Sequence, residues 1–177
     1  MEKRMEKIKK KRIIRQAGMV YGLFVIALFL VLGFVIGIAV VDGNSMQPTL
    51  QNKSLLIYSK FDKNFKKGDI VIIEDAEKEL LVKRIVGVEK DVLSIEHGDL
   101  YINGKQESAE YRMGETRVKQ GNVTYPYEIK KDQIFVMGDN RENSKDSRMF
   151  GACSASQIKG KVIFHIGVEN DKETKGN

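Results

Sequence analysis

A serine lies in an unusual setting in the segment GNSMQPTL, residues 43–50. Ser45 stands between a Gly-Asn turn and a Met-x-Pro-Thr run, and the segment begins two residues after a long apolar stretch ends. A serine hydroxyl acts as a nucleophile when a neighbouring base removes its proton. The segment is therefore either a plain exit loop or a turn that holds a reactive hydroxyl close to a membrane surface.

The segment LLVKRIVGV, residues 80–88, contains a lysine that could be such a base. Leu81 and Ile85 lie two positions to either side of Lys83, so in a strand all three side chains point to the same face. Burial on an apolar face lowers the pKa of a lysine, and a neutral amine can accept a proton from a hydroxyl. The alternative is that Lys83 reaches solvent from a strand edge. Arg84 points to the opposite face and needs an acidic partner if it is buried.

A third segment, MGDNRENSKDSRMFG at residues 137–151, concentrates acids, hydroxyls and arginines before an aromatic residue. A turn-rich loop with local side-chain caps explains these residue types. It does not explain why acid, hydroxyl and arginine alternate. The segment is therefore a third candidate for a functional role.

Metal ligands are scarce, and the pattern predicts no metal or cofactor site. The two histidines, His97 and His165, have no close cysteine or carboxylate at the spacing of a zinc site, so we expect them to be structural or exposed to solvent. A Ser-His-Asp triad stays open, because triads are assembled in space. Cys153 is the only cysteine, so no intramolecular disulfide forms, and we expect it to be a small packed residue.

An uncharged apolar stretch, residues 16–41, precedes the three segments. At about 1.5 Å per residue in a helix it spans about 39 Å, enough to cross a hydrocarbon core of about 30 Å. A cleavable signal peptide is the competing interpretation, but its apolar region usually runs about 7–15 residues. We expect an uncleaved single-pass anchor, with Ser45 no more than about 13 Å along the chain from its end.

The charge distribution indicates which side of the membrane each part occupies. Residues 1–15 hold eight basic and two acidic side chains, an excess that equals the formal net charge of +6 of the whole chain. The positive-inside rule keeps this segment in the cytoplasm and places residues 42–177 outside it. Since the remaining residues carry 22 basic and 22 acidic groups, no nucleic-acid partner is predicted.

Two Gly-x-x-x-Gly pairs occur within the apolar stretch, formed by Gly18 with Gly22 and by Gly33 with Gly37. The pairs are separated by 11 residues, about three helical turns, so all four glycines share one helix face. Such a face can support a weak helix–helix dimer through the anchor.

The sequence after the anchor has the pattern of short β-strands. Expected strands are SLLIYSK, GDIVIIED, ELLVKRIVGVE, DVLSI, DLYINGKQ with an Asn103-Gly104 hairpin turn, YEIKKDQIFVMGDN and KGKVIFHIG. Residues 105–127 are polar and irregular, and the charged tail from Glu169 is expected to fray. No helical periodicity is sustained beyond the anchor. The predicted fold is mostly β: one transmembrane helix at residues 16–41, then a compact, largely antiparallel domain at 42–177 with long loops.

The three segments together resemble the bacterial type I signal (leader) peptidases, which are membrane-bound Ser/Lys proteases. GNSMQPTL is similar to the nucleophile motif of that family, KRIVG to its lysine motif and GDNRENSKDSR to its loop signature. FKKGDIVII is similar to a further family segment. The motifs follow an anchor in the family's order, up to about Lys161, and the short chain looks most like the Gram-positive members.

The resemblance implies a role for each matching residue. Ser45 would be the nucleophile, Lys83 the general base, and Ser144 would orient the amine of Lys83 by a hydrogen bond. Asp139 would pair with Arg84, and Asp146 with Arg148, to brace the loop that carries Ser144. The backbone N–H of Ser45 would form part of the oxyanion hole. One position departs from the pattern of some members, where a serine two residues before the nucleophile also reaches the oxyanion; here it is Gly43.

The resemblance further implies that the substrates are exported precursor proteins, cut at their signal peptides next to the bilayer. One alternative is the related self-cleaving repressor type, which is soluble and cytoplasmic, so the anchor argues against it. A second is a membrane-tethered β module that only binds a partner, in which Ser45 and Lys83 would lie far apart. A dyad requires instead that the hydroxyl and the amine lie about 3 Å apart.

Overall fold

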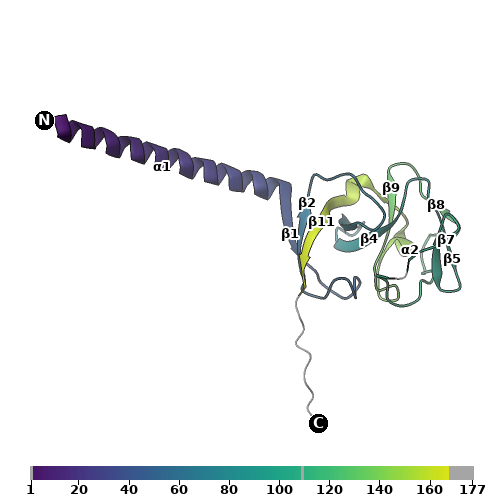
Figure 1. Ribbon diagram of the computed structural model, residues 1–177. Coiled ribbons are helices and arrows are strands. Elements are labelled where there is room, and N and C mark those ends of the chain that lie inside the picture. Colours follow the sequence, from purple (N-terminus) through teal and green to yellow (C-terminus); the bar gives the residue numbers. More distant parts are fainter. Residues whose placement is uncertain (1, 109, 168–177) are drawn as a thin grey trace, which may run out of the picture. The chain divides into compact units, whose positions relative to one another are not determined.

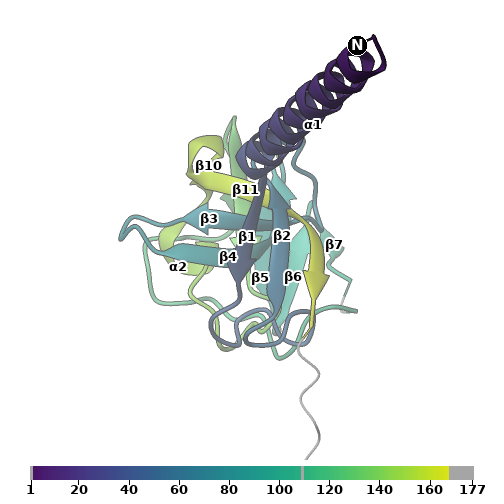
Figure 2. The same ribbon diagram turned by 90° about the vertical axis from the view of Figure 1, so that its left-hand side faces the viewer.

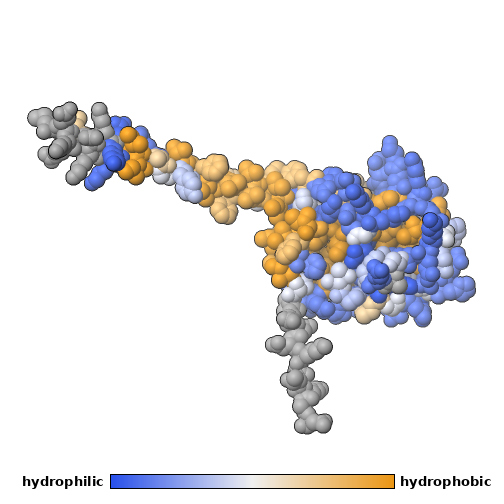
Figure 3. Space-filling model, in the orientation of Figure 1, coloured by the Kyte–Doolittle hydropathy of each residue, from blue (hydrophilic) through white to orange (hydrophobic). Residues whose placement is uncertain are grey.

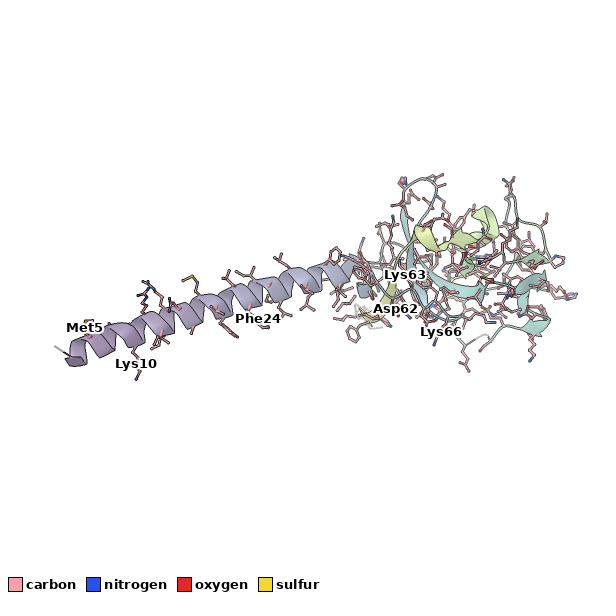
Figure 4. The ribbon with its side chains drawn as sticks, turned by 90° about the horizontal axis from the view of Figure 1, so that it is seen from above. Met5, Lys10, Phe24, Asp62, Lys63 and Lys66 are labelled. Carbon is pink, nitrogen blue, oxygen red and sulfur yellow. The ribbon has the colours of Figure 1, made fainter. Side chains whose placement is uncertain are left out.

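The structure is a computed structural model that describes residues 2–108 and 110–167, and these divide into two compact units after Ile36. The first unit is helix α1 (Glu2–Val35) (Figure 1). Its segment Lys10–Val35 is long and apolar enough to cross a membrane. Figure 4 shows its side chains directed away from the helix axis, with Lys10 near the N-terminal end and Phe24 in the apolar part. The tail expected from Glu169 lies outside the described residues.

The apolar stretch of the sequence does not end where the helix ends. Residues Ile36–Val40 form strand β1, and Val41 is 3% exposed in a hydrophobic cluster of the second unit. Ser45 therefore follows the helix by ten residues and not by four, so the expected limit of about 13 Å does not apply. Strand residues at the end of an anchor are as apolar as the anchor itself, which explains the difference.

Gly37 lies in β1, so the prediction that four glycines share one helix face was wrong. A Cβ atom at this position would come within 2.1 Å of the Tyr58 ring. The missing side chain of Gly37 thus makes room for an aromatic ring on a neighbouring strand, and it cannot contribute to a helix–helix contact.

A seven-stranded sheet forms most of the second unit. Its further strands are β2 (Leu55–Ser59), β3 (Ile70–Glu74), β4 (Leu80–Val88), β9 (Gln133–Met137), β10 (Cys153–Ser154) and β11 (Ile158–Ile166). The strand order is β1-β2-β11-β3-β4-β9-β10, and Figure 2 shows β1, β2 and β11 side by side. The pairs from β2 to β10 are antiparallel, as predicted.

A smaller sheet has the order β7-β6-β5-β8 and consists of β5 (Val92–Glu96), β6 (Asp99–Ile102), β7 (Lys105–Gln106) and β8 (Tyr127–Glu128). The predicted Asn103-Gly104 turn joins β6 to β7. The single strand predicted across residues 127–140 is split, because a turn at Lys130–Gln133 separates β8 from β9 and the two belong to different sheets. Asp132 in that turn has a positive φ of 59°. Two short helices, α2 (Ser147–Phe150) and η1 (Ala155–Gln157), complete the unit.

Alternation along β9 divides the core between the two faces of the larger sheet. Ile134 and Val136 pack with Val71, Ile85 and other residues in one cluster. Phe135 and Met137 pack in a second cluster, which includes residues of β5 and β6. The mostly β architecture with an N-terminal apolar helix agrees with the predicted fold class.

Apolar side chains also remain exposed on neighbouring strands at one end of the larger sheet. They are Ile38 and Val40 of β1, Leu55 of β2, and Ile163, Phe164 and Ile166 of β11. Figure 3 shows apolar surface on this side of the β unit. An apolar patch on a folded domain commonly marks contact with a partner or a membrane.

Candidate active site

The turn that carries Ser45 is fixed by the apolar residues around it. Met46 and Leu50 are each 1% exposed, and the N–H of Leu50 donates to the carbonyl oxygen of Met46 at 2.9 Å. These two side chains belong to the cluster that also contains Val41 and Leu56. The buried side chains of Met46 and Leu50 thus fix the turn to the core, and the half-buried Ser45 lies at the start of the turn.

Lys83 reaches Ser45 from the apolar face of β4. It lies opposite Val71 of β3 and on the same face as Ile85, both fully buried, and is itself 2% exposed. Its Nζ lies 2.9 Å from the Oγ of Ser45 and donates a second hydrogen bond of 2.9 Å to the carbonyl oxygen of Val82. The hydroxyl and the amine thus have the separation that a dyad requires.

Burial lowers the pKa of Lys83 to about 8. The negative charges of Asp146 and Asp139 oppose this shift, whereas the positive charge of Lys119 adds to it. Unlike arginine, lysine loses its proton readily when it is desolvated. A buried amine with this pKa, hydrogen-bonded to a hydroxyl, can take the proton of that hydroxyl near neutral pH.

Arg84 points away from Lys83 and pairs with Asp139. The guanidinium donates two hydrogen bonds to the carboxylate, of 2.8 Å from Nε and 2.7 Å from Nη2. Thr49, in the nucleophile turn, donates to the same carboxylate at 2.5 Å and accepts a hydrogen bond from Arg84. The ring of Tyr111 lies 4.2 Å from the guanidinium carbon. The ion pair therefore joins β4, the nucleophile turn and the loop after β9.

Asp146 and Arg148 form the second ion pair that the family resemblance implies, and both side chains are 0% exposed. Asp146 also accepts the N–H of Gly138, and it caps the start of α2. Burial alone would raise the pKa of Asp146, but the hydrogen bond and charge of Arg148 hold that pKa below its usual range. The buried pair thus closes the loop 138–148 on itself.

Ser144 is 5% exposed in this loop. Its hydroxyl has no partner at full hydrogen-bond geometry among the described residues, but its interaction with the Asp146 carboxylate helps to lower the pKa of that carboxyl. The hydrogen bond expected from Ser144 to Lys83 is thus not formed in the structure, since the amine donates to the Val82 carbonyl instead. The Oγ of Ser144 lies close to the backbone of Gly138, where a Cβ atom would be 2.3 Å from it and 2.4 Å from the Ser45 carbonyl oxygen. Ser144 and Ser45 therefore meet at Gly138.

Several residues that hold the site were not identified from the sequence. Asn140 binds the nucleophile turn twice, through its N–H to the Ser45 carbonyl at 3.0 Å and its side-chain amide to the Asn44 carbonyl. Arg141 is fully buried and pairs with Glu107 at 2.6 Å, which attaches the polar segment after β7 to the loop. Asn140 and Arg141 lie inside a segment that the sequence marked, but their partners are distant in sequence, so no local pattern gives them.

The remaining candidate residues lie elsewhere. His97 and His165 are both exposed to solvent, as expected, and no described contact joins either one to Ser45. Cys153 is 1% exposed in the core, and burial raises the pKa of its thiol to about 11. Among the described residues, one group of carboxylates is close enough to hold a cation, at Asp75, Glu77 and Glu79, and the ammonium group of Lys145 lies among them.

Comparison with known proteins gives a consistent result. Residues 14–166 match the family described as signal peptidase, peptidase S26. The chain is 35% identical over 174 residues to signal peptidase I of Bacillus amyloliquefaciens, covering 93% of this chain and 94% of that protein. It is 33% identical over 158 residues to signal peptidase IB of Staphylococcus aureus, covering 80% and 83%. A crystal structure of a signal peptidase I from Enterococcus faecalis aligns with a TM-score of 0.46 and 23% identity, covering 55% of this chain and 95% of that one.

Proposed function

Because the chain belongs to the signal peptidase family (peptidase S26), a family of serine endopeptidases, we propose that it removes signal peptides from exported precursor proteins by a Ser/Lys dyad. Ser45 is the nucleophile and Lys83 is the general base. The membrane-bound precursors are its partners, and the reaction uses no cofactor.

The observation that carries this assignment is the 2.9 Å hydrogen bond between the Oγ of Ser45 and the Nζ of a lysine that is 2% exposed. A buried lysine without a carboxylate partner is costly, and it is rarely kept for stability. A binding module offers no reason for such a lysine, and it predicts that the two side chains lie far apart. The short distance and the lowered pKa together support a catalytic pair.

In the first step, the Oγ of Ser45 attacks the scissile carbonyl carbon and its proton passes to the Nζ of Lys83. The backbone N–H of Ser45 stabilises the resulting oxyanion, and Gly43 contributes no side chain. When the C–N bond breaks, Lys83 returns the proton to the departing amine, which becomes the N-terminus of the mature protein. The signal peptide remains as an ester on Ser45. Lys83 then takes a proton from water, whose attack releases the peptide carboxylate and restores the serine.

The supporting residues keep Ser45 and Lys83 in position relative to each other. Asp139 with Arg84 fixes the nucleophile turn against β4, and Asp146 with Arg148 fixes the loop that carries Ser144. The buried Ser144 hydroxyl has no partner at full hydrogen-bond geometry among the described residues and lies near the Asp146 carboxylate, and we assign it the role of orienting the Lys83 amine during the reaction.

We propose that the anchor holds this chemistry at a membrane. We assign residues 1–15 to the cytoplasm, the apolar part of α1 to the bilayer and the unit from Gly37 onward to the extracytoplasmic side. The exposed apolar residues of β1, β2 and β11 suit a domain that works at a bilayer surface. Gly18 and Gly22 are the one Gly-x-x-x-Gly pair that lies within α1 and could support a weak contact between two anchors, since Gly37 lies in a strand.

The test is cleavage of a purified precursor by the full-length protein in detergent, with the new N-terminus identified by sequencing. Wild type should release the mature protein, and Ser45→Ala should be inactive. His97→Ala and His165→Ala should retain activity, because the dyad needs no imidazole. Activity in Ser45→Ala, or its loss in a folded histidine variant, would contradict the assignment.

A further inference from the structure

The loop segment that carries Ser144 is held from one side by a lysine of the long polar segment 107–121. The Nζ of Lys119 donates to the carbonyl oxygen of Ser144 at 2.5 Å and to that of Glu142 at 3.3 Å. Both acceptors are main-chain atoms, so the ammonium group fixes the backbone on each side of Asn143. The position of the Ser144 backbone therefore depends on a residue 25 positions away.

The same segment is held from the other side by the residue after Ser144. The Nζ of Lys145 lies 2.8 Å from the Asp75 carboxylate and also contacts Glu77 and Glu79 in the β3–β4 turn. Asp75 is 4% exposed at its side chain, and its Oδ1 accepts the backbone N–H groups of Glu77 and Glu79 at 2.9 and 3.0 Å. The position of the Asp75 carboxylate is thus fixed, and Lys145 attaches the loop that carries Ser144 to this carboxylate.

Surface ion pairs usually contribute little to stability, and three carboxylates around one lysine could be no more than a solvated cluster. Two features argue for a more specific role. Lys119 binds the carbonyl oxygen of Ser144, and Lys145 is the residue that follows Ser144, so both act on the same stretch of backbone. The Ser144 hydroxyl has no partner at full hydrogen-bond geometry among the described residues and lies near the Asp146 carboxylate, so its place depends largely on the backbone that carries it.

We propose that Lys119 and Lys145 are positioning residues that clamp the Ser144 backbone from two sides and so keep its hydroxyl beside the Ser45–Lys83 pair. This inference rests on the proposed dyad function. A displacement of about 1 Å in a catalytic constellation can lower a rate by about a hundredfold, so a clamp of this kind acts on the rate more than on substrate binding.

The experiment measures kcat and KM for precursor cleavage by the full-length protein in detergent. Lys119→Met and Lys145→Met should each lower kcat about tenfold while KM stays within about twofold. Lys145→Arg should recover most of the loss, because arginine can still pair with the Asp75 carboxylate. The matched control is Lys78→Met: Lys78 lies in the same β3–β4 turn, pairs with Glu74 at 3.1 Å and has no described contact with the loop. Its kcat should stay within about twofold of wild type.

A second pair of measurements separates positioning from a general loss of structure. Asp75→Asn keeps the oxygen that caps the turn but removes the charge, so it should lower kcat as Lys145→Met does. The double variant Asp75→Asn, Lys145→Met should lose no more kcat than either single variant. The charged groups that act on Lys83 are Asp146, Asp139 and Lys119, so Lys119→Met should also move the pH midpoint of kcat/KM upward, whereas Lys145→Met should not.

Wild-type kcat in both methionine variants would overturn the inference, as would an equal loss of kcat in Lys78→Met. Additive losses in the Asp75→Asn, Lys145→Met double variant would also count against it. Ser45→Ala, assayed in parallel, separates this inference from the function on which it rests. If Ser45→Ala is inactive and the lysine variants behave as wild type, only the clamp is refuted. If Ser45→Ala cleaves the precursor, the dyad itself is wrong.

Discussion

The pH dependence of cleavage is the most direct test of Lys83 as the general base. With a pKa of about 8, roughly one-tenth of the free enzyme carries a neutral Lys83 at pH 7, half at pH 8 and about nine-tenths at pH 9. Only the neutral amine accepts the proton of Ser45. We therefore expect kcat/KM to rise about tenfold from pH 7 to pH 9 and then to level off.

The assay follows kcat/KM of the detergent-solubilised enzyme on one precursor between pH 6 and pH 10 at constant ionic strength. Lys83→Arg provides the decisive comparison, because arginine keeps the positive charge but does not deprotonate in proteins. Loss of a general base typically costs about 10²–10⁴ in rate, so this variant should be at least about a hundredfold slower than wild type at pH 9, where most of the wild-type Lys83 is neutral.

Two results would refute the reasoning. A rate that is flat or falls from pH 7 to pH 9 would mean that a neutral Lys83 is not required. Substantial turnover by Lys83→Arg would mean that the residue acts as a positive charge and not as a base. The wild-type profile and the variant therefore test the same claim by independent routes.

Three further predictions concern stability. The folded pKa of Lys83, about 8, lies below the unfolded value of 10.5, so the unfolded chain binds more protons between pH 8 and pH 10.5, and the free energy of unfolding rises with pH there. Lys83→Met removes the cost of a buried charge, so it should raise the free energy of unfolding at pH 7 by up to about 3 kcal/mol in urea titrations. Asp139→Asn leaves Arg84 without its carboxylate and should cost about 3–5 kcal/mol in the same titrations. Deleting residues 2–35 should leave the melting temperature of the β unit unchanged, whereas deleting 2–41 removes β1 and Val41 and should lower it by calorimetry.

The strands could be predicted because their side chains alternate between two environments. The pattern around Lys83 also gave the correct face, since Leu81 and Ile85 mark the side that packs into the core. Both ion pairs came from the family resemblance. Local pattern alone cannot choose Asp139 as the partner of Arg84 across 55 residues, and it does not single out Asp146 for Arg148 among the several charged residues of the same loop.

Other features depend on information that is absent from a local pattern. Hydropathy cannot distinguish the end of α1 from β1, since both are apolar. The split between β8 and β9 depends on a turn of charged residues that also suit a strand surface. The rotamer of Ser144 and the contacts of Lys119 and Lys145 are set by packing between segments distant in sequence.

The crowding at Gly138 has a consequence for how this chain can change over evolutionary time. A single methyl group there would collide with the main-chain oxygen of Ser45 and the hydroxyl of Ser144, and the main-chain atom cannot swing aside as a flexible side chain could. Gly138 carries no reactive group, yet natural selection should remove substitutions of Gly138 as strictly as substitutions of Ser45. An invariant glycine at this position across descendants would record a lack of space between two serines and not a chemical role of its own.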